Sequence, residues 1–190
     1  GKRKSKIHNL ETLVAFVELH DQIFIKRTNN KNHIVKFSGH FSNKVPKLNT
    51  VSNLLNILDK KKKLKNHKYS ILIKKNIPQK SGLGGGSMNA ASLINYFEKK
   101  NKINLTLKER YNLCSKIGSD VILGIDQKNL IISYKKKTTK IKKNLKMFTL
   151  MVKPNFGCST KIIYSKTKEK TKPKYNNPKI SLFSINNIKK

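Results

Sequence analysis

The chain has 190 residues, enough for one domain or one domain with part of a second, and its hydrophobic fraction of 36% allows a modest core. Its formal net charge is +34, yet only three of its 43 basic residues are arginine, the residue preferred for bidentate phosphate and guanine contacts. The sequence has no zinc-ligand spacing, no RNP-like strand and no apolar run that could span a bilayer, which argues against a sequence-specific nucleic-acid binder or a membrane protein. The spread of lysine along the chain indicates a biased composition on a solvated surface.

The cysteines and the chain ends bear on the compartment. Cys114 and Cys158 form no metal-ligand spacing, so a reducing, cytoplasmic environment is expected. The opening segment 1–6 has neither an apolar signal core nor a methionine. We therefore expect the natural protein to extend upstream of Gly1, and the lysine pair at 189–190 suggests the same for the other end.

The first part of the chain is predicted to form strands followed by a helix. β-Branched and aromatic residues fill 13–19 and 22–26, and His20-Asp21 between them predicts a hairpin turn. Another short strand is expected over 34–37. Apolar residues then recur at helical spacing, which predicts an amphipathic helix that begins near residue 49: Val51, Leu54, Leu55 and Leu58.

A glycine-rich loop follows the next predicted strand. Alternating residues indicate a strand over 68–77, which runs through Pro78 into four glycines within positions 82–86. Glycine lets the backbone approach a ligand closely, and a loop between a strand and a helix directs successive amides at an anion. The following helix is marked by four apolar residues on one face: Ala90, Ala91, Ile94 and Phe97. This arrangement predicts a phosphate-binding loop rather than a flexible linker.

The remaining elements complete a mixed pattern. Thr106 and Glu109 predict a capping box for a second helix, which Gly118 ends. Its buried face is expected to carry three side chains: Leu107, Cys114 and Ile117. Strands are expected over 130–134 and 148–153 around a lysine-rich loop, 135–146, and residues 166–179 are expected to be an exposed loop. The mixture predicts an α+β fold.

Other phosphate-loop types do not fit these residues. A P-loop would end in Gly-Lys-Ser/Thr, whereas Gly86-Ser87-Met88 has no lysine. In a dinucleotide fingerprint beginning at Gly82, the last glycine would fall on Ser87. Of the four aspartates, Asp120 alone follows a helix-ending glycine and precedes an apolar segment, so it is either a helix cap or a catalytic group.

The glycine loop resembles a known family. The pattern Pro-x-x-x-Gly-Leu-Gly-Gly-Gly-Ser-x-Asn-Ala-Ala over 78–91 resembles the second motif of the GHMP kinase superfamily. Its tripled glycine is most similar to the branch that phosphorylates 4-diphosphocytidyl-2-C-methyl-D-erythritol. Further segments also resemble that branch: 1–12, 49–51, 118–121 and 154–164. Three residues depart from its usual sequence: Ile7 replaces tyrosine, Met88 replaces serine and Ile122 replaces proline.

The resemblance implies a fold, an activity and a set of site residues. The expected fold has a ribosomal-protein-like α/β domain over 1–146 and the start of a ferredoxin-like domain over 147–190. The expected enzyme transfers phosphate from ATP, with Mg²⁺, to the 2-hydroxyl of 4-diphosphocytidyl-2-C-methyl-D-erythritol in non-mevalonate isoprenoid synthesis. Asp120 would accept or orient the hydroxyl proton, and its lysine partner would lie upstream of Gly1. The substrate residues would be His8, Thr160 and Tyr164.

ATP is expected to bind at the loop, through Pro78, Gln79, Lys80, Ser81, Gly82, Leu83, Gly84, Gly85, Gly86, Ser87 and Met88. No residue is assigned to the metal, and no nucleic-acid or membrane partner is expected. Because its partner lysine would lie outside the chain, this segment by itself is expected to be inactive. Two alternatives remain: a GHMP kinase for another small molecule, such as a mevalonate derivative, homoserine or a sugar, and a basic nucleic-acid-binding protein.

Overall fold

A computed structural model describes residues 11–100, 102–133, 138–141, 148–152 and 165–166 of the chain. Its contacts divide the chain into two units, Glu18–Asp126 and the combination of Gly1–Val17 with Gln127–Lys190. The glycine loop and Asp120 both belong to the first of these units.

The unit 18–126 is built on a three-stranded sheet in the order β2-β4-β3. Strand β4 (Lys68–Lys74) lies in the centre, antiparallel to β2 (Gln22–Thr28) and parallel to β3 (Ile34–Ser38). Helix α1 (Thr50–Lys60) connects the two parallel strands, as a crossover connection requires. Strand β4 then leads through the glycine loop into α2 (Gly85–Lys99).

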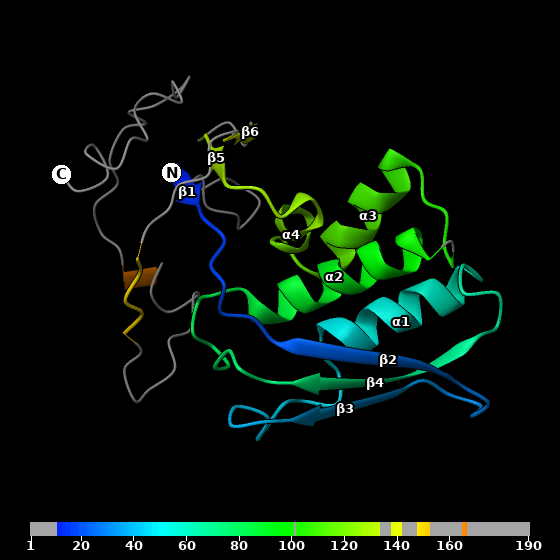
Figure 1. Ribbon diagram of the computed structural model, residues 1–190. Helices are drawn as coiled ribbons and strands as arrows, with labels where there is room; N and C mark the ends of the chain where they lie inside the picture. The colour runs from blue at the N-terminus through cyan, green and yellow to red at the C-terminus, as the bar shows by residue number, and fades with distance from the viewer. Residues whose placement is uncertain (1–10, 101, 134–137, 142–147, 153–164, 167–190) are drawn as a thin grey trace. The chain divides into compact units, whose positions relative to one another are not determined.

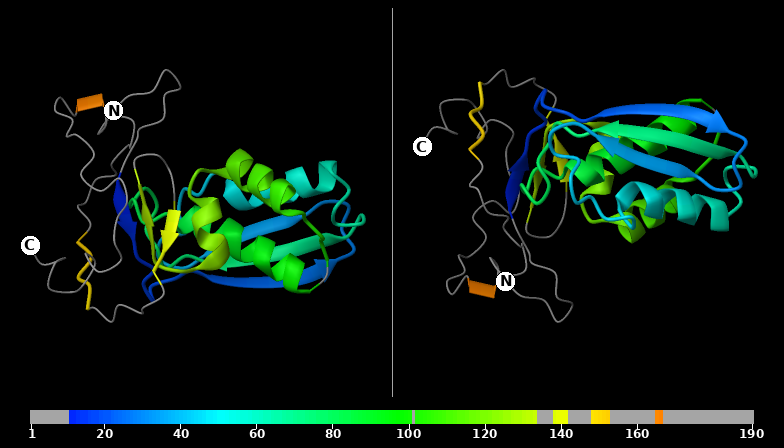
Figure 2. Two further views of the ribbon diagram at one scale, coloured as in Figure 1. Left: turned by 90° about the horizontal axis from the view of Figure 1, so that it is seen from above. Right: turned by 90° about the horizontal axis from the view of Figure 1, so that it is seen from below.

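Helices α1 and α2 pack side by side on one face of this sheet (Figures 1 and 2). The predicted periodicities account for the packing, because the apolar residues of α1 and α2 are the ones that are buried, together with Ile71 and Ile73 of β4. Helix α3 (Leu107–Ile117) and the short helix α4 (Val121–Asp126) follow, and α4 contacts α2. The capping box of Thr106 and Glu109 is present as predicted.

The second unit contains a small antiparallel sheet in the order β1-β5-β6. Its strands are β1 (Thr12–Val14), β5 (Leu130–Ile132) and β6 (Thr138–Lys140). The Asn129 side chain accepts a hydrogen bond from the Phe16 amide at 2.9 Å, which fixes the chain beyond β1 beside the start of β5. The domain boundary expected between residues 146 and 147 lies outside the described residues, and it stays a prediction.

Three sequence expectations are wrong. Residues 13–26 do not form a hairpin, because β1 pairs with β5 and β2 pairs with β4. Residues 148–152 form no strand, and Phe148 is fully exposed. The Leu107 side chain is 70% exposed rather than buried: it lies in the first turn of α3, and the buried residues of this helix are Leu113 and Cys114.

Within the described part of the chain, no helix combines the length and the apolar character that crossing a bilayer requires.

Candidate active site

The first turn of α2 carries backbone amides that no side chain caps. Gly84 is the N-cap residue, with a left-handed φ of 67°, and it has no side chain to accept a hydrogen bond. The first helical hydrogen bond is donated by the Met88 amide to the Gly84 carbonyl oxygen at 3.0 Å. The amides of Gly85, Gly86 and Ser87 therefore remain available, and the helix dipole adds positive partial charge at this point. These are the features of an anion site.

The start of α1 differs from that of α2 in this respect. The Asn49 side chain accepts hydrogen bonds from the amides of Val51 and Ser52 at 3.1 and 3.0 Å, so α1 caps itself. The first residue of α1, Thr50, instead supports the glycine loop by donating its hydroxyl to the Gly86 carbonyl oxygen at 2.7 Å. The first amides of α1 are thus capped by a side chain, whereas the first amides of α2 have no side-chain partner.

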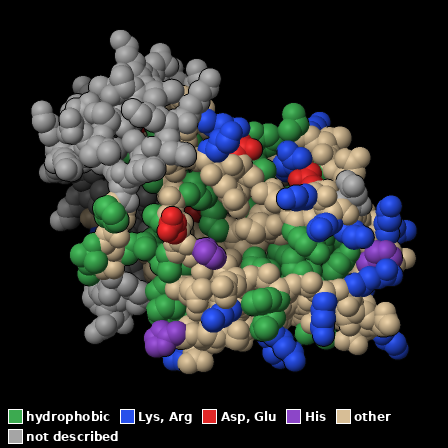
Figure 3. Space-filling view, in the orientation of Figure 1, with side chains coloured by type: hydrophobic (Ala, Val, Ile, Leu, Met, Phe, Trp, Pro, Cys, Tyr) green, Lys and Arg blue, Asp and Glu red, His purple; other side chains and the backbone are tan. Residues whose placement is uncertain are grey.

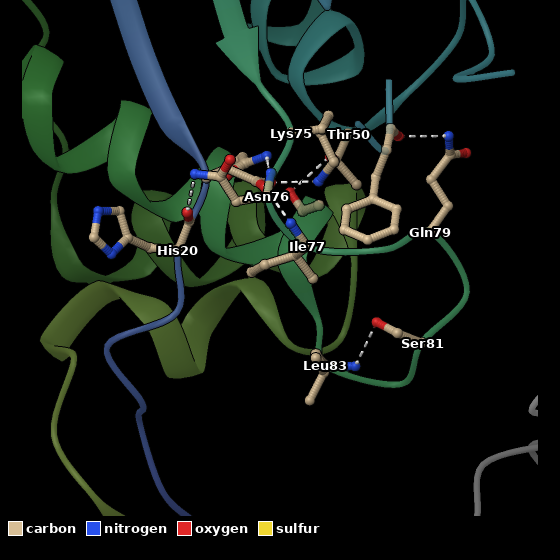
Figure 4. Close-up of polar contacts among 12 residues, drawn as sticks. His20, Thr50, Lys75, Asn76, Ile77, Gln79, Ser81 and Leu83 are labelled. Atoms are coloured by element: carbon tan, nitrogen blue, oxygen red, sulfur yellow. Dashed lines mark hydrogen bonds and ion pairs between the residues drawn. The ribbon is translucent and has the colours of Figure 1, made fainter. Parts of the chain in front are cut away.

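The outer part of the loop is held by a few polar contacts (Figure 4). The Gln79 side chain donates to the carbonyl oxygens of Phe41 at 3.2 Å and Asn43 at 2.6 Å. The Leu83 amide donates to the Ser81 hydroxyl at 3.4 Å. Gly82, like Gly84, has a positive φ, and a Cβ atom added at either glycine would have no protein atom within 4 Å. The loop therefore presents bare backbone toward open space.

Asp120 lies in a segment that reaches the start of α2. A Cβ atom built on Gly118 would be 3.5 Å from the Ser87 hydroxyl, so the turn between α3 and α4 packs against the end of the glycine loop. Asp120 is exposed, and it accepts a hydrogen bond from the Ser119 hydroxyl at 2.9 Å. The fold thus brings the segment of the predicted catalytic aspartate to the predicted phosphate loop, although Ser87 and Asp120 are 33 positions apart in the sequence.

The Met88 side chain is used in packing between helices. A Cβ atom at Gly124 would lie 2.8 Å from the sulfur of Met88 and 2.8 Å from the Ala91 methyl group. A glycine in α4 therefore makes room for the side chain at position 88, where the family usually has serine. In this chain, position 88 contributes to the contact between α2 and α4.

With this geometry in place, comparison with known proteins identifies the family. A family described as GHMP kinases N terminal domain matches residues 49–132, which include the loop and Asp120. A 4-diphosphocytidyl-2-C-methyl-D-erythritol kinase from Pelagibacter ubique (strain HTCC1062) is 48% identical over 187 residues, covering 98% of this chain and 66% of that protein. The chain belongs to the GHMP kinase family. A protein of the same name from Clostridium perfringens (strain SM101 / Type A) is 31% identical, covering 87% of this chain and 57% of that protein.

A solved structure shows the same fold. The crystal structure of a 4-(cytidine 5'-diphospho)-2C-methyl-D-erythritol kinase matches 68% of this chain and 44% of its own, with a TM-score of 0.51 and 23% sequence identity. The expected GHMP kinase fold is therefore confirmed. This GHMP kinase chain spans 66% and 57% of the lengths of the two sequence relatives.

Sequence reasoning missed a buried polar cluster at the base of the loop, which we call the Asp21 cluster: Asp21, Lys75 and Asn89. Asp21 was expected in a hairpin turn, but no hairpin forms there and the Asp21 side chain is 0% exposed. It pairs with the Lys75 ammonium group and accepts a hydrogen bond from the Asn89 amide group at 2.8 Å. No local sequence pattern predicts this cluster, because the three residues come from different parts of the sequence.

The other predicted site residues remain predictions. His8, Thr160 and Tyr164 lie outside the described residues. Within the described ranges, no group of three or more His, Cys, Asp and Glu side chains could hold a metal ion. A separate hollow of about 600 Å³ is found beyond the C-terminal ends of α1 and α2, lined by Lys62, Lys63, Lys65, Glu98, Lys102, Ile103, Asn104, Leu105 and Arg110. None of its lining residues belongs to the glycine loop, and four of them are lysines.

Proposed function

We propose that the protein transfers phosphate from ATP to the 2-hydroxyl of 4-diphosphocytidyl-2-C-methyl-D-erythritol, in the cytoplasm, as a step of isoprenoid precursor synthesis. The observation that carries this proposal is the uncapped start of α2 beside the turn that holds Asp120. The names of the two sequence relatives supply the substrate, since both are called kinases of this compound.

The loop residues 78–88 would bind the ATP phosphates mainly through backbone amides. Such preorganised donors stabilise the charge that spreads over the phosphoryl oxygens during transfer. Mg²⁺ would arrive with the nucleotide, bound by phosphate oxygens and water, as is usual for this ion in kinases. When bound, it would neutralise part of the phosphate charge.

Asp120 would orient the acceptor hydroxyl and take its proton. Its carboxylate is exposed and already anchored by the Ser119 hydroxyl, so one oxygen is held while the carboxylate stays accessible to a ligand. The cytidine end of the substrate would be held by His8, Thr160 and Tyr164, where an aromatic ring can stack on the base.

Activity is best measured in a protein of the relatives' full length. We would build a chimaera in which this chain replaces the matching segment of the Pelagibacter ubique relative, because 98% of the chain aligns with it at 48% identity. Phosphate transfer from ATP is expected to 4-diphosphocytidyl-2-C-methyl-D-erythritol, and not to homoserine, a mevalonate derivative or a sugar. Transfer to one of those three alcohols instead would show that the proposed substrate is wrong.

The role of Asp120 is tested in the same chimaera. Asparagine keeps the shape of the side chain and cannot take a proton, so Asp120→Asn should lower kcat by about 10²–10⁴-fold. The affinity for ATP and the melting temperature should stay close to those of the parent. Asp126→Asn, at the far end of α4, is the matched control and should keep the parent kcat. A parent-like rate for Asp120→Asn would show that Asp120 has a structural role and does not take the proton.

A further inference from the structure

One buried carboxylate is bonded to both ends of the glycine loop. Asp21 Oδ1 accepts hydrogen bonds from the amides of Asn76 at 2.8 Å and Ile77 at 2.9 Å (Figure 4). Asp21 Oδ2 accepts from the Asn89 side chain at 2.8 Å and from the Lys75 ammonium group. These four bonds match the capacity of a carboxylate, which has about four acceptor positions.

The partners of Asp21 bracket the residues that would bind phosphate. Asn76 and Ile77 directly precede Pro78, and Asn89 directly follows Met88. The residues on both sides of segment 78–88 therefore donate hydrogen bonds to the same carboxylate. Ile77 also packs closely against the backbone of Gly85, because a Cβ atom built on Gly85 would lie 3.1 Å from Cγ2 of Ile77.

The charges in this cluster need an explanation beyond stability. The side chains of Asp21 and Lys75 are 0% and 7% exposed. Burial alone would raise the pKa of Asp21, but the hydrogen bonds from Lys75, Ile77, Asn89 and Asn76 outweigh burial and hold that pKa below its usual value. Asp21 is therefore ionised at neutral pH. Apolar side chains of similar size often stabilise a core as well as a buried ion pair does, so stability alone does not explain the pair of Asp21 and Lys75. The positions of the hydrogen-bond partners of Asp21 are the more informative observation.

We propose that the Asp21 cluster positions the glycine loop, so that the first amides of α2 are held in one orientation for the ATP phosphates. The inference rests on the proposed function for its ligand. Asp21, Lys75 and Asn89 act through the backbone they hold and are positioning residues rather than groups that contact ATP. Asn89 connects the helix side of the loop to Asp21, while Asn76 and Ile77 connect the strand side.

The test uses variants that loosen one side of the loop in the full-length chimaera. Asn89→Ala releases the helix side. The double variant Asp21→Asn, Lys75→Met removes both charges together, which avoids leaving one charge buried without its partner. The matched control is Asp59→Asn, Lys68→Met, because Asp59 and Lys68 form a partly buried ion pair at 2.5 Å that also connects a helix to β4. That pair joins the end of α1 to the start of β4, away from the loop.

A positioning role predicts a specific kinetic change. With each variant folded at the assay temperature, both cluster variants should raise the Kd and KM for ATP by about 10-fold or more, since small misplacements of binding groups are costly. The KM for the alcohol substrate should stay near that of the parent. The control should lose stability without a change in either constant for ATP. If the cluster variants behave like the control, the Asp21 cluster is structural only and the inference is overturned.

Hydrogen exchange separates this inference from the proposed function. Without any nucleotide, peptides that cover residues 78–88 should exchange faster in Asn89→Ala than in the parent and in the control. A parent protein that bound no ATP would refute the proposed function, while faster exchange would still support the loop-holding role of Asn89. Unchanged exchange in this segment would overturn it.

Discussion

Gly84 shows most directly how one residue shapes the candidate site. It begins α2 with a φ of 67°, and a Cβ atom at this position would meet no protein atom within 4 Å. The space beside it is therefore not needed for packing, unlike the space beside Gly85, where Ile77 lies close. A substitution at Gly84 affects the backbone conformation and any bound ligand, and leaves the core unchanged.

We expect Gly84→Ala to weaken ATP binding in the full-length chimaera by about 10-fold or more, because the new methyl group obstructs close approach of a phosphate to the backbone. It should also lower the free energy of unfolding by about 1–2 kcal/mol, the cost of the left-handed conformation for a residue with a Cβ atom. Nucleotide titration and chemical denaturation measure the two effects.

Gly84→Asn separates the two effects, since asparagine tolerates the left-handed conformation better than alanine. It should keep more of the stability and still weaken ATP binding. Parent-like ATP affinity in both variants would show that the ATP phosphates do not bind beside Gly84.

At the scale of elements, local patterns predicted the helices that hold the loop. Asn49, Thr106 and Gly118 mark helix ends by chemistry within a few residues, and each is confirmed. The pairing of β1 with β5 joins Thr12 to Ile132, and no local pattern specifies a partner so far along the chain. Helix α4 has only six residues, too few to show a helical period.

The candidate site also combines features that local sequence predicts with contacts between residues that are distant in the sequence. The strand, loop and helix that form the proposed phosphate site are contiguous in sequence, so the strand–loop–helix arrangement around residues 78–88 could be predicted as a unit. The Asp21 cluster could not, because Asp21, Lys75 and Asn89 meet only after β2, β4 and α2 have packed together. The use of Thr50 to support Gly86 depends on the same packing.

The packing of α3 can be tested through Cys114, which is fully buried. Burial raises the pKa of this thiol to about 11, so the thiol is protonated at neutral pH, and its complete burial keeps reagents from reaching it in the folded protein. In the Cys158→Ser chain, we expect a thiol reagent to label Cys114 at least about 10²-fold more slowly than in denaturant, since the unfolded fraction of a stable protein is about 10⁻³ or less.

The matched control moves the thiol by one residue along α3. The triple variant Cys114→Ala, Ser115→Cys, Cys158→Ser places one thiol on the exposed face, and it should be labelled rapidly without denaturant. Equal labelling rates for the two native proteins would mean that α3 is not packed as the structure has it.

At the scale of the whole molecule, the positive charge far exceeds the available carboxylates. The chain has 43 lysine and arginine residues against 9 acidic residues, and lysine and arginine side chains are scattered over the face seen in Figure 3. Several ion pairs use the carboxylates present, such as Lys63 with Glu109 at 2.7 Å and Arg110 with Glu98 at 2.7 Å. The excess is nearly all lysine, which makes point-charge contacts to phosphate and carries little information about base sequence.

We therefore expect any binding of DNA by this chain to be independent of base sequence and to collapse with salt. If about 6–10 phosphates are contacted, affinity should fall by about 10³–10⁵-fold between 50 and 200 mM salt, because binding releases condensed counterions. Fluorescence anisotropy with two duplexes of unrelated sequence measures both properties. ATP binding to the chimaera is the internal control and should change far less over this range, since it depends on short-range amide contacts at one site. A complex that prefers one duplex and survives at 200 mM salt would instead favour a nucleic-acid-binding role, and the lysine-rich surface would then have a function of its own.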